Sequence, residues 1–157
     1  MPDQIYRALV LSVVKHDYLP NAVAAHPRFQ LVAVAVDPDG PGWTHERNQL
    51  FADQHNIPYR RDVETALADC DLVVVSPEAE RHCDLALRAA EAGKHIVVDK
   101  PLSPSLTECN DLVAAVAQHG VKCLVWNRNF LPALIEARDN LTKGAIGVLQ
   151  AIHCDFY

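Results

Sequence analysis

The chain has the sequence DLVVVSPEAERHCDLALRAAEAGKHIVVDK at residues 71–100, where two short apolar runs flank an amphipathic stretch. The runs at residues 71–76 and 95–99 are rich in valine and apolar between their polar end residues, which is typical of strands covered on both faces of a sheet. Between them, at residues 78–92, apolar side chains recur at helical spacing and charged side chains occupy the opposite side. Strand, helix and strand in this order predict two parallel strands joined by a right-handed crossover.

The same alternation continues on both sides of this unit. Apolar, β-branched runs predict further strands at residues 6–12, 30–36 and 121–126. Thr44, Asp62 and Ser103 are expected to cap three helices, and a fourth helix is expected at residues 132–143. The helix that follows Ser103 has an apolar stripe, which we expect to face the core: Leu106, Cys109, Val113 and Val116. The fold class is therefore predicted to be α/β, with a doubly wound, Rossmann-like parallel sheet.

The last part of the chain departs from this alternation. Residues 149–157 (Leu149–Tyr157) alternate apolar and polar side chains, which predicts a strand with no visible partner. We expect a Rossmann-type dinucleotide-binding domain at residues 1–128, followed at residues 129–157 by a linking helix and the first strand of an incomplete second domain. Such a strand could pair with a second copy or a separate chain, so a homo-oligomer is expected.

Composition excludes several classes of protein. The formal net charge is −6, with both signs mixed along 157 residues, which argues against a nucleic-acid partner. Apolar runs are far shorter than the roughly 20 residues that cross a bilayer, and a secretory signal is absent, so a cytoplasmic protein is expected. Five scattered cysteines and eight histidines show no metal-ligand spacing, so we expect reduced thiols and no metal site. The two tryptophans, Trp43 and Trp126, are expected to pack structurally.

Ligands of open parallel sheets bind at the carboxyl ends of the strands, so the residues after each predicted strand are the candidates. Residues 12–17, SVVKHD, follow the first strand, where a dinucleotide site has GxGxxG. Ser12, Val14, Lys15 and His16 are the candidate cofactor residues here. Val14 adds a branched side chain where phosphate must approach, and Asp17 adds negative charge that Lys15 and His16 partly offset. The loop either receives a nucleotide in an altered geometry or is purely structural.

Asp37 follows the second predicted strand. A carboxylate there can accept hydrogen bonds from both ribose hydroxyls of an adenosine and would repel a 2′-phosphate, which favours NAD over NADP. The alternative is a turn, because residues 37–41 (DPDGP) are all turn formers.

Asp99, Lys100 and Pro101 follow the strand at residues 95–99. A lysine at a strand end can hydrogen-bond a substrate oxygen and assist the departure of its proton, in a general acid/base or electrostatic role. Position alone also allows a solvated lysine with no such role.

These residues carry a resemblance to a known family. Residues 92–101, AGKHIVVDKP, resemble the EAGKHVxxEKP signature of the glucose-fructose oxidoreductase/inositol dehydrogenase (Gfo/Idh/MocA) family. Asn127, Arg128, Phe130 and Pro132 resemble its NxRFxP segment, and residues 144–147 resemble its GxIG turn into the second domain. His82 matches the histidine that follows the fourth strand of the family, with Ser76 at the strand's end. The resemblance covers nearly the whole chain.

The resemblance implies an NAD- or NADP-binding Rossmann domain followed by an α/β domain that binds substrate and forms oligomers. It implies Lys100 as the catalytic lysine, Asn127 and Arg128 beside nicotinamide or substrate, and four cofactor contacts: Asp37, Ser76, His82 and Asp99. This sequence departs from the family in lacking the glycine loop, in having Asp99 in place of the usual glutamate, and in being about half as long as its members.

We therefore expect an NAD(P)-dependent oxidoreductase that transfers hydride to or from a sugar- or polyol-like small molecule, present here as its nucleotide-binding portion. The alternative is a redox-inactive binding or assembly module derived from the family and associating through residues 149–157. This alternative is motivated by Val14, Asp17 and the missing substrate domain.

Overall fold

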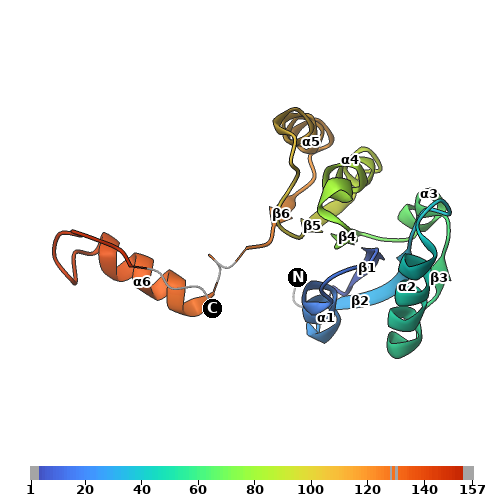
Figure 1. Ribbon diagram of the computed structural model, residues 1–157, viewed down its shortest axis with the longest axis horizontal. Coiled ribbons are helices and arrows are strands. Elements are labelled where there is room, and N and C mark those ends of the chain that lie inside the picture. Colours follow the sequence, from blue (N-terminus) through green and yellow to red (C-terminus); the bar gives the residue numbers. More distant parts are fainter. Residues whose placement is uncertain (1–3, 128, 130, 154–157) are drawn as a thin grey trace. The chain divides into compact units, whose positions relative to one another are not determined.

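The apolar runs of the sequence form a parallel sheet in the computed structural model, which describes residues 4–127, 129 and 131–153. Within these residues the sheet has six strands in the order β3-β2-β1-β4-β5-β6 (Figure 1). All five strand pairs are parallel. The order reverses between β1 and β4, as expected for a doubly wound α/β fold, so the predicted fold class is confirmed.

The strands are β1 (Tyr6–Leu11), β2 (Phe29–Ala35), β3 (Tyr59–Arg60), β4 (Leu72–Val75), β5 (His95–Val98) and β6 (Cys123–Val125). The helices are α1 (Tyr18–Ala25), α2 (Gly42–His55), α3 (Val63–Leu67), α4 (His82–Glu91), α5 (Leu106–His119) and α6 (Pro132–Thr142), and the short 3₁₀ helix η1 (Ala79–Arg81) precedes α4.

The strands are buried on both faces, which explains why their sequences are apolar throughout. Alternate residues of β1 belong to different layers. Leu9 and Leu11 belong to the core cluster that includes side chains of α3, α4 and α5. Val10 alternates with them and is also fully buried, on the other face, while α1 and α2 pack against β2. Because β1 pairs with β4 and β4 pairs with β5, all in parallel, the carboxyl ends of these three strands lie side by side.

Helix starts differ from the prediction at two places. Asp62 caps α3 as predicted, since its carboxylate accepts a hydrogen bond from the Thr65 amide at 3.1 Å. However, α2 begins at Gly42, so Thr44 lies inside the helix and is fully buried. In α5 the cap is Ser105, and the Ser103 hydroxyl accepts instead from the Ser105 amide at 2.9 Å.

The predicted buried stripe of α5 is only partly right. Cys109 and Val116 pack against the core, but Leu106 and Val113 are exposed. The most buried side chain of this helix is Leu112. Because successive helical residues are separated by about 100°, a stripe centred on Leu112 turns Val113 toward solvent.

The described residues divide into two compact units between Val125 and Trp126. The second unit contains α6, which has no buried residue among those described. Residues 149–153 have no regular secondary structure, and residues 154–157 of the predicted final strand lie outside the described part. That strand, and the predicted domain boundary at residue 128, stay predictions.

Four cysteines are described, and all are free thiols. Cys70 and Cys83 are buried, and burial raises the pKa of the Cys70 thiol to about 11. Within the described ranges, none of the helices has the length and apolar character needed to span a membrane, and no cluster of three potential metal ligands occurs.

Candidate functional site

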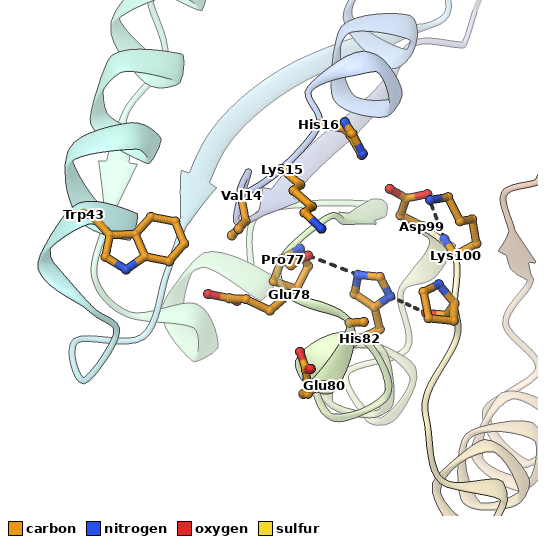
Figure 2. Close-up of a pocket in the computed structure, with 12 residues that line it drawn as sticks. Val14, Lys15, His16, Trp43, Pro77, Glu78, Glu80, His82, Asp99 and Lys100 are labelled. Carbon is orange, nitrogen blue, oxygen red and sulfur yellow. Dashed lines mark hydrogen bonds between the residues drawn. The ribbon is translucent and has the colours of Figure 1, made fainter. Parts of the chain in front are cut away.

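A cavity of about 500 Å³ lies at the carboxyl edge of the sheet, within the first compact unit. The loops that follow β1, β4 and β5 contribute to it, together with the first turn of α2 (Figure 2). Its lining residues are Val14, Lys15, His16, Trp43, Pro77, Glu78, Ala79, Glu80, His82, Asp99, Lys100 and Pro101. Six predicted cofactor or catalytic residues therefore share one cavity: Val14, Lys15, His16, His82, Asp99 and Lys100.

Ser12 makes the turn that a glycine would make in a dinucleotide-binding loop. Its φ is +61°, in the left-handed region that favours glycine. Asn48 of α2, which is fully buried, holds the residue in place by donating to the Ser12 hydroxyl at 3.2 Å. Asn48 also donates to the Thr44 carbonyl at 2.8 Å. The serine thus keeps the sharp turn through a side-chain anchor on the next helix.

The amides that follow Ser12 are already hydrogen-bonded within the protein. The Val13 amide donates to the Asn48 side-chain oxygen at 2.7 Å, and the Val14 amide donates to the Ser76 carbonyl at 3.3 Å. Neither amide is therefore available to a phosphate in this conformation. In the described part of the chain, the amides of Lys15 and His16 have no such partner, and both residues line the cavity.

Asp17 lies away from the cavity. It lines a separate hollow with Arg47 of α2, and it is absent from the residues that line the larger cavity. Its carboxylate therefore opposes an anion in that cavity less than the sequence suggested. The β1 loop itself brings the cationic side chain of Lys15 and the imidazole of His16 to the cavity.

Asp99 is buried and holds the end of β5 against the start of α1. The Tyr18 hydroxyl donates to Asp99 Oδ1 at 2.5 Å, and the Lys100 amide donates to the same oxygen at 2.7 Å. Asp99 is thus fixed from two sides, while the Lys100 side chain is exposed at the cavity (Figure 2). Sequence reasoning did not find Tyr18, because the contact joins residues 81 positions apart.

His82 and Ser76 brace the loops of the cavity. One ring nitrogen of the buried His82 donates to the Pro101 carbonyl at 2.5 Å, and the other lies 3.2 Å from the Pro77 carbonyl oxygen. The Ser76 hydroxyl donates to the His16 carbonyl at 3.2 Å. These side chains tie the loops after β1, β4 and β5 together. A direct cofactor contact by either residue stays a prediction.

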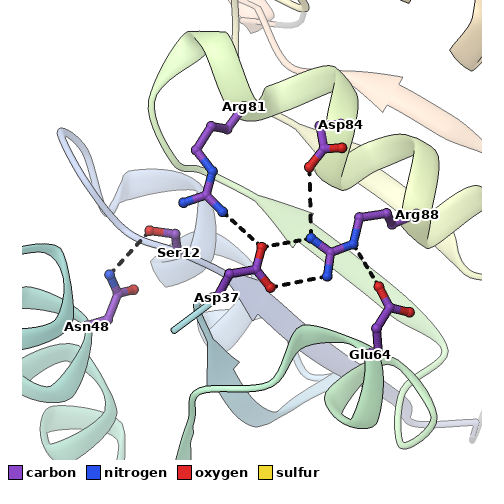
Figure 3. A network of polar contacts seen from close by, with 7 residues as sticks. All are labelled: Ser12, Asp37, Asn48, Glu64, Arg81, Asp84 and Arg88. Carbon is purple, nitrogen blue, oxygen red and sulfur yellow. Dashed lines mark hydrogen bonds and ion pairs between the residues drawn. The ribbon is translucent and has the colours of Figure 1, made fainter. Parts of the chain in front are cut away.

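Asp37 does not present a free carboxylate. Its oxygens accept from Arg81 at 3.0 Å and from Arg88 at 2.7 and 3.1 Å (Figure 3). Arg88 also contacts Glu64 at 2.7 Å and Asp84 at 3.8 Å. The carboxylate of Asp37, and to a smaller extent that of Glu64, raises the pKa of Arg88 above its ordinary value although burial lowers it.

The prediction that Trp43 packs structurally is wrong. Its side chain is 52% exposed and lines the cavity. It is the second residue of α2, and nothing in its sequence context distinguished it from a packing residue.

Asn127 belongs to the second compact unit, and Arg128 lies outside the described residues. Their predicted substrate contacts therefore stay predictions.

Comparison with known proteins decides the family. The model of the oxidoreductase family with an NAD-binding Rossmann fold, GFO_IDH_MocA, matches residues 12–126. The chain belongs to the Gfo/Idh/MocA family. The resemblance found in the motif at residues 92–101 is thereby confirmed, and the match includes the loop in which the glycines are absent.

Relatives of this Gfo/Idh/MocA chain support the same assignment. The uncharacterized oxidoreductase YhhX of Escherichia coli (strain K12) is 33% identical over 107 residues, which is 65% of this chain and 31% of YhhX. The scyllo-inositol 2-dehydrogenase (NAD(+)) of Bacillus subtilis (strain 168) is 38% identical over 78 residues, 49% of this chain and 23% of the relative. The chain thus spans about a third or less of these relatives.

Solved structures show the same fold. Apo scyllo-inositol dehydrogenase from Lactobacillus casei superposes with a TM-score of 0.79 at 18% identity, covering 94% of this chain and 44% of that chain.

Proposed function

We propose that this chain binds the nicotinamide dinucleotide of an NAD(P)-dependent oxidoreductase, which transfers hydride to or from a sugar- or polyol-like substrate. The observation that carries the proposal is the shared cavity at the carboxyl edge of the sheet, where the β1 loop and Lys100 meet. This edge, beside the reversal of strand order, is where ligands of doubly wound sheets bind.

The residues of the cavity suit such a ligand. Lys15 supplies a positive charge, and the amides of Lys15 and His16 supply donors for a diphosphate. Glu78 Oε2 is buried with no hydrogen-bond partner among the described residues. It is a strong acceptor at the cavity, where a ligand hydroxyl or amine would satisfy it. The Lys15 ammonium thus offers the diphosphate a cationic contact in place of the Val13 and Val14 amides, and Glu78 offers an acceptor to a different, hydrogen-bond-donating part of the ligand.

The proposal gives Lys100 the role of the proton-transfer group, because its side chain is exposed at the cavity. Bound nicotinamide supplies the hydride acceptor or donor. In the oxidation of a substrate alcohol, Lys100 Nζ accepts the hydroxyl proton as the hydride leaves, and in the reduction of a carbonyl it returns that proton. Asp99, held by Tyr18 and by the Lys100 amide, fixes the backbone that carries this amine.

Titration with NADH and NADPH tests the binding step. Trp126→Phe leaves Trp43 as the sole tryptophan. Because Trp43 lines the cavity, its emission is expected to fall as either reduced dinucleotide binds, with Kd in the micromolar to millimolar range. Calorimetry without heat of binding and unchanged Trp43 emission at millimolar cofactor would contradict the proposal.

A further inference from the structure

Asp37 is the residue from which the sequence predicts a preference for NAD, and its ion pairs bear on that prediction. An unpaired carboxylate at the end of β2 accepts both ribose hydroxyls and repels a 2′-phosphate. Here Arg81 and Arg88 donate three hydrogen bonds to Asp37. A ribose diol would have to displace a guanidinium from this carboxylate in order to bind to it.

Arg81 has spare donor capacity. A guanidinium carries five N–H donors. Within the described residues, Asp37 is the only hydrogen-bond partner of the Arg81 side chain, through one N–H. Arg88 by contrast is committed to Asp37 and Glu64 as well as lying near Asp84. An added anion can therefore be bound by Arg81 without breaking an existing ion pair.

The charges of the cluster also favour binding of an anion. Asp37 with Arg81 and Arg88 carries one net positive charge. Glu64 and Asp84 contact Arg88 rather than Arg81 (Figure 3). Their side chains are 67% and 64% exposed, so water screens them, whereas those of Asp37 and Arg81 are mostly buried. The mostly buried part of the cluster, Asp37 with its two arginines, is therefore the cationic part.

We propose that the Arg81 guanidinium, with Asp37 neutralised by Arg88, binds the 2′-phosphate of the adenosine ribose, so that this chain prefers NADPH to NADH. The inference rests on the proposed function, because it takes a nicotinamide dinucleotide to bind at this edge of the sheet. Asp37 then stabilises the arginines and leaves the ribose hydroxyls unbound.

Competitive titration of the whole chain with NADPH and NADH is the test, since the two share the same nicotinamide and give comparable signals. NADPH is expected to bind about tenfold more tightly, a typical gain for a charge-assisted contact with phosphate. Arg81→Gln is expected to remove that preference while leaving the Kd of NADH within about threefold, and Arg81→Lys to restore part of it. Arg138→Gln removes an exposed arginine of the second unit and is the matched control.

The outcomes separate the two proposals. Tighter binding of NADH, or an Arg81→Gln variant that melts like the parent and keeps the NADPH preference, overturns the 2′-phosphate assignment and leaves the proposed function standing. If neither dinucleotide binds, both fail. Should Arg81→Gln unfold, Arg81→Lys and the wild-type affinity ratio decide the question.

Discussion

Lys15→Glu is expected to weaken binding of NADPH or NADH by about 50-fold. Lys15 is the lysine of the β1 loop that lines the cavity, and the Val13 and Val14 amides are already bonded within the protein. Reversal of its charge removes an attraction to the diphosphate and adds a repulsion, each worth roughly 1–2 kcal/mol at a partly exposed site. Isothermal titration calorimetry at constant ionic strength measures the change.

The control for this variant is Lys122→Glu. Lys122 is exposed and precedes β6, at the opposite edge of the sheet from the cavity. It therefore makes the same change in net charge without touching the site. Equal losses of affinity in the two variants would mean that the effect comes from overall charge, and the role given to Lys15 would be wrong.

Asn48→Ala is expected to lower the free energy of unfolding by about 3 kcal/mol, because the buried Val13 amide loses its acceptor and the buried Thr44 carbonyl loses a donor. For a chain of this size that corresponds to a fall in Tm of about 10 °C. Thermal unfolding followed by circular dichroism gives both quantities.

Gln49→Ala is the matched control for Asn48→Ala. Gln49 is the next residue of α2, exposed, and its side chain donates to Asp53 on the surface. Its loss is expected to change stability by less than about 0.5 kcal/mol. If Asn48→Ala were equally mild, Asn48 would not be the anchor of the β1 loop.

The fold was largely predictable from the sequence because burial on both faces forces apolar runs onto the strands. Five strands, β1, β2, β4, β5 and β6, all lie where such runs occur. β3 was not predicted, since Tyr59–Arg60 is too short to show any periodicity. The sequence analysis placed Val113 in the buried stripe of α5, but its neighbour Leu112 is the buried residue. Helical spacing alone is compatible with both stripes.

The site was predictable where a residue follows a strand directly, and at His82 through the family resemblance. Lys100, Asp99 and the β1 loop were found in this way, and they do share a cavity. The sequence could not predict the hydrogen-bond and ion-pair partners that other elements contribute. The ion pair of Arg88 with Asp37 joins residues 51 positions apart, and because of it Asp37 does not present a free carboxylate. Asn48, 35 residues from Val13, is the reason that a loop without glycines can still turn.

Cofactor protection of lysines from reductive methylation, followed by mass spectrometry, tests most directly whether this edge of the sheet holds the dinucleotide. The chain has five lysines, of which Lys15 and Lys100 line the cavity while Lys122 and Lys143 are exposed elsewhere. With NADPH or NADH at about ten times its Kd, methylation of Lys15 and Lys100 is expected to slow about tenfold, and that of Lys122 and Lys143 to stay unchanged. Unaltered rates at Lys15 and Lys100 under saturating cofactor would contradict the assignment of the cavity.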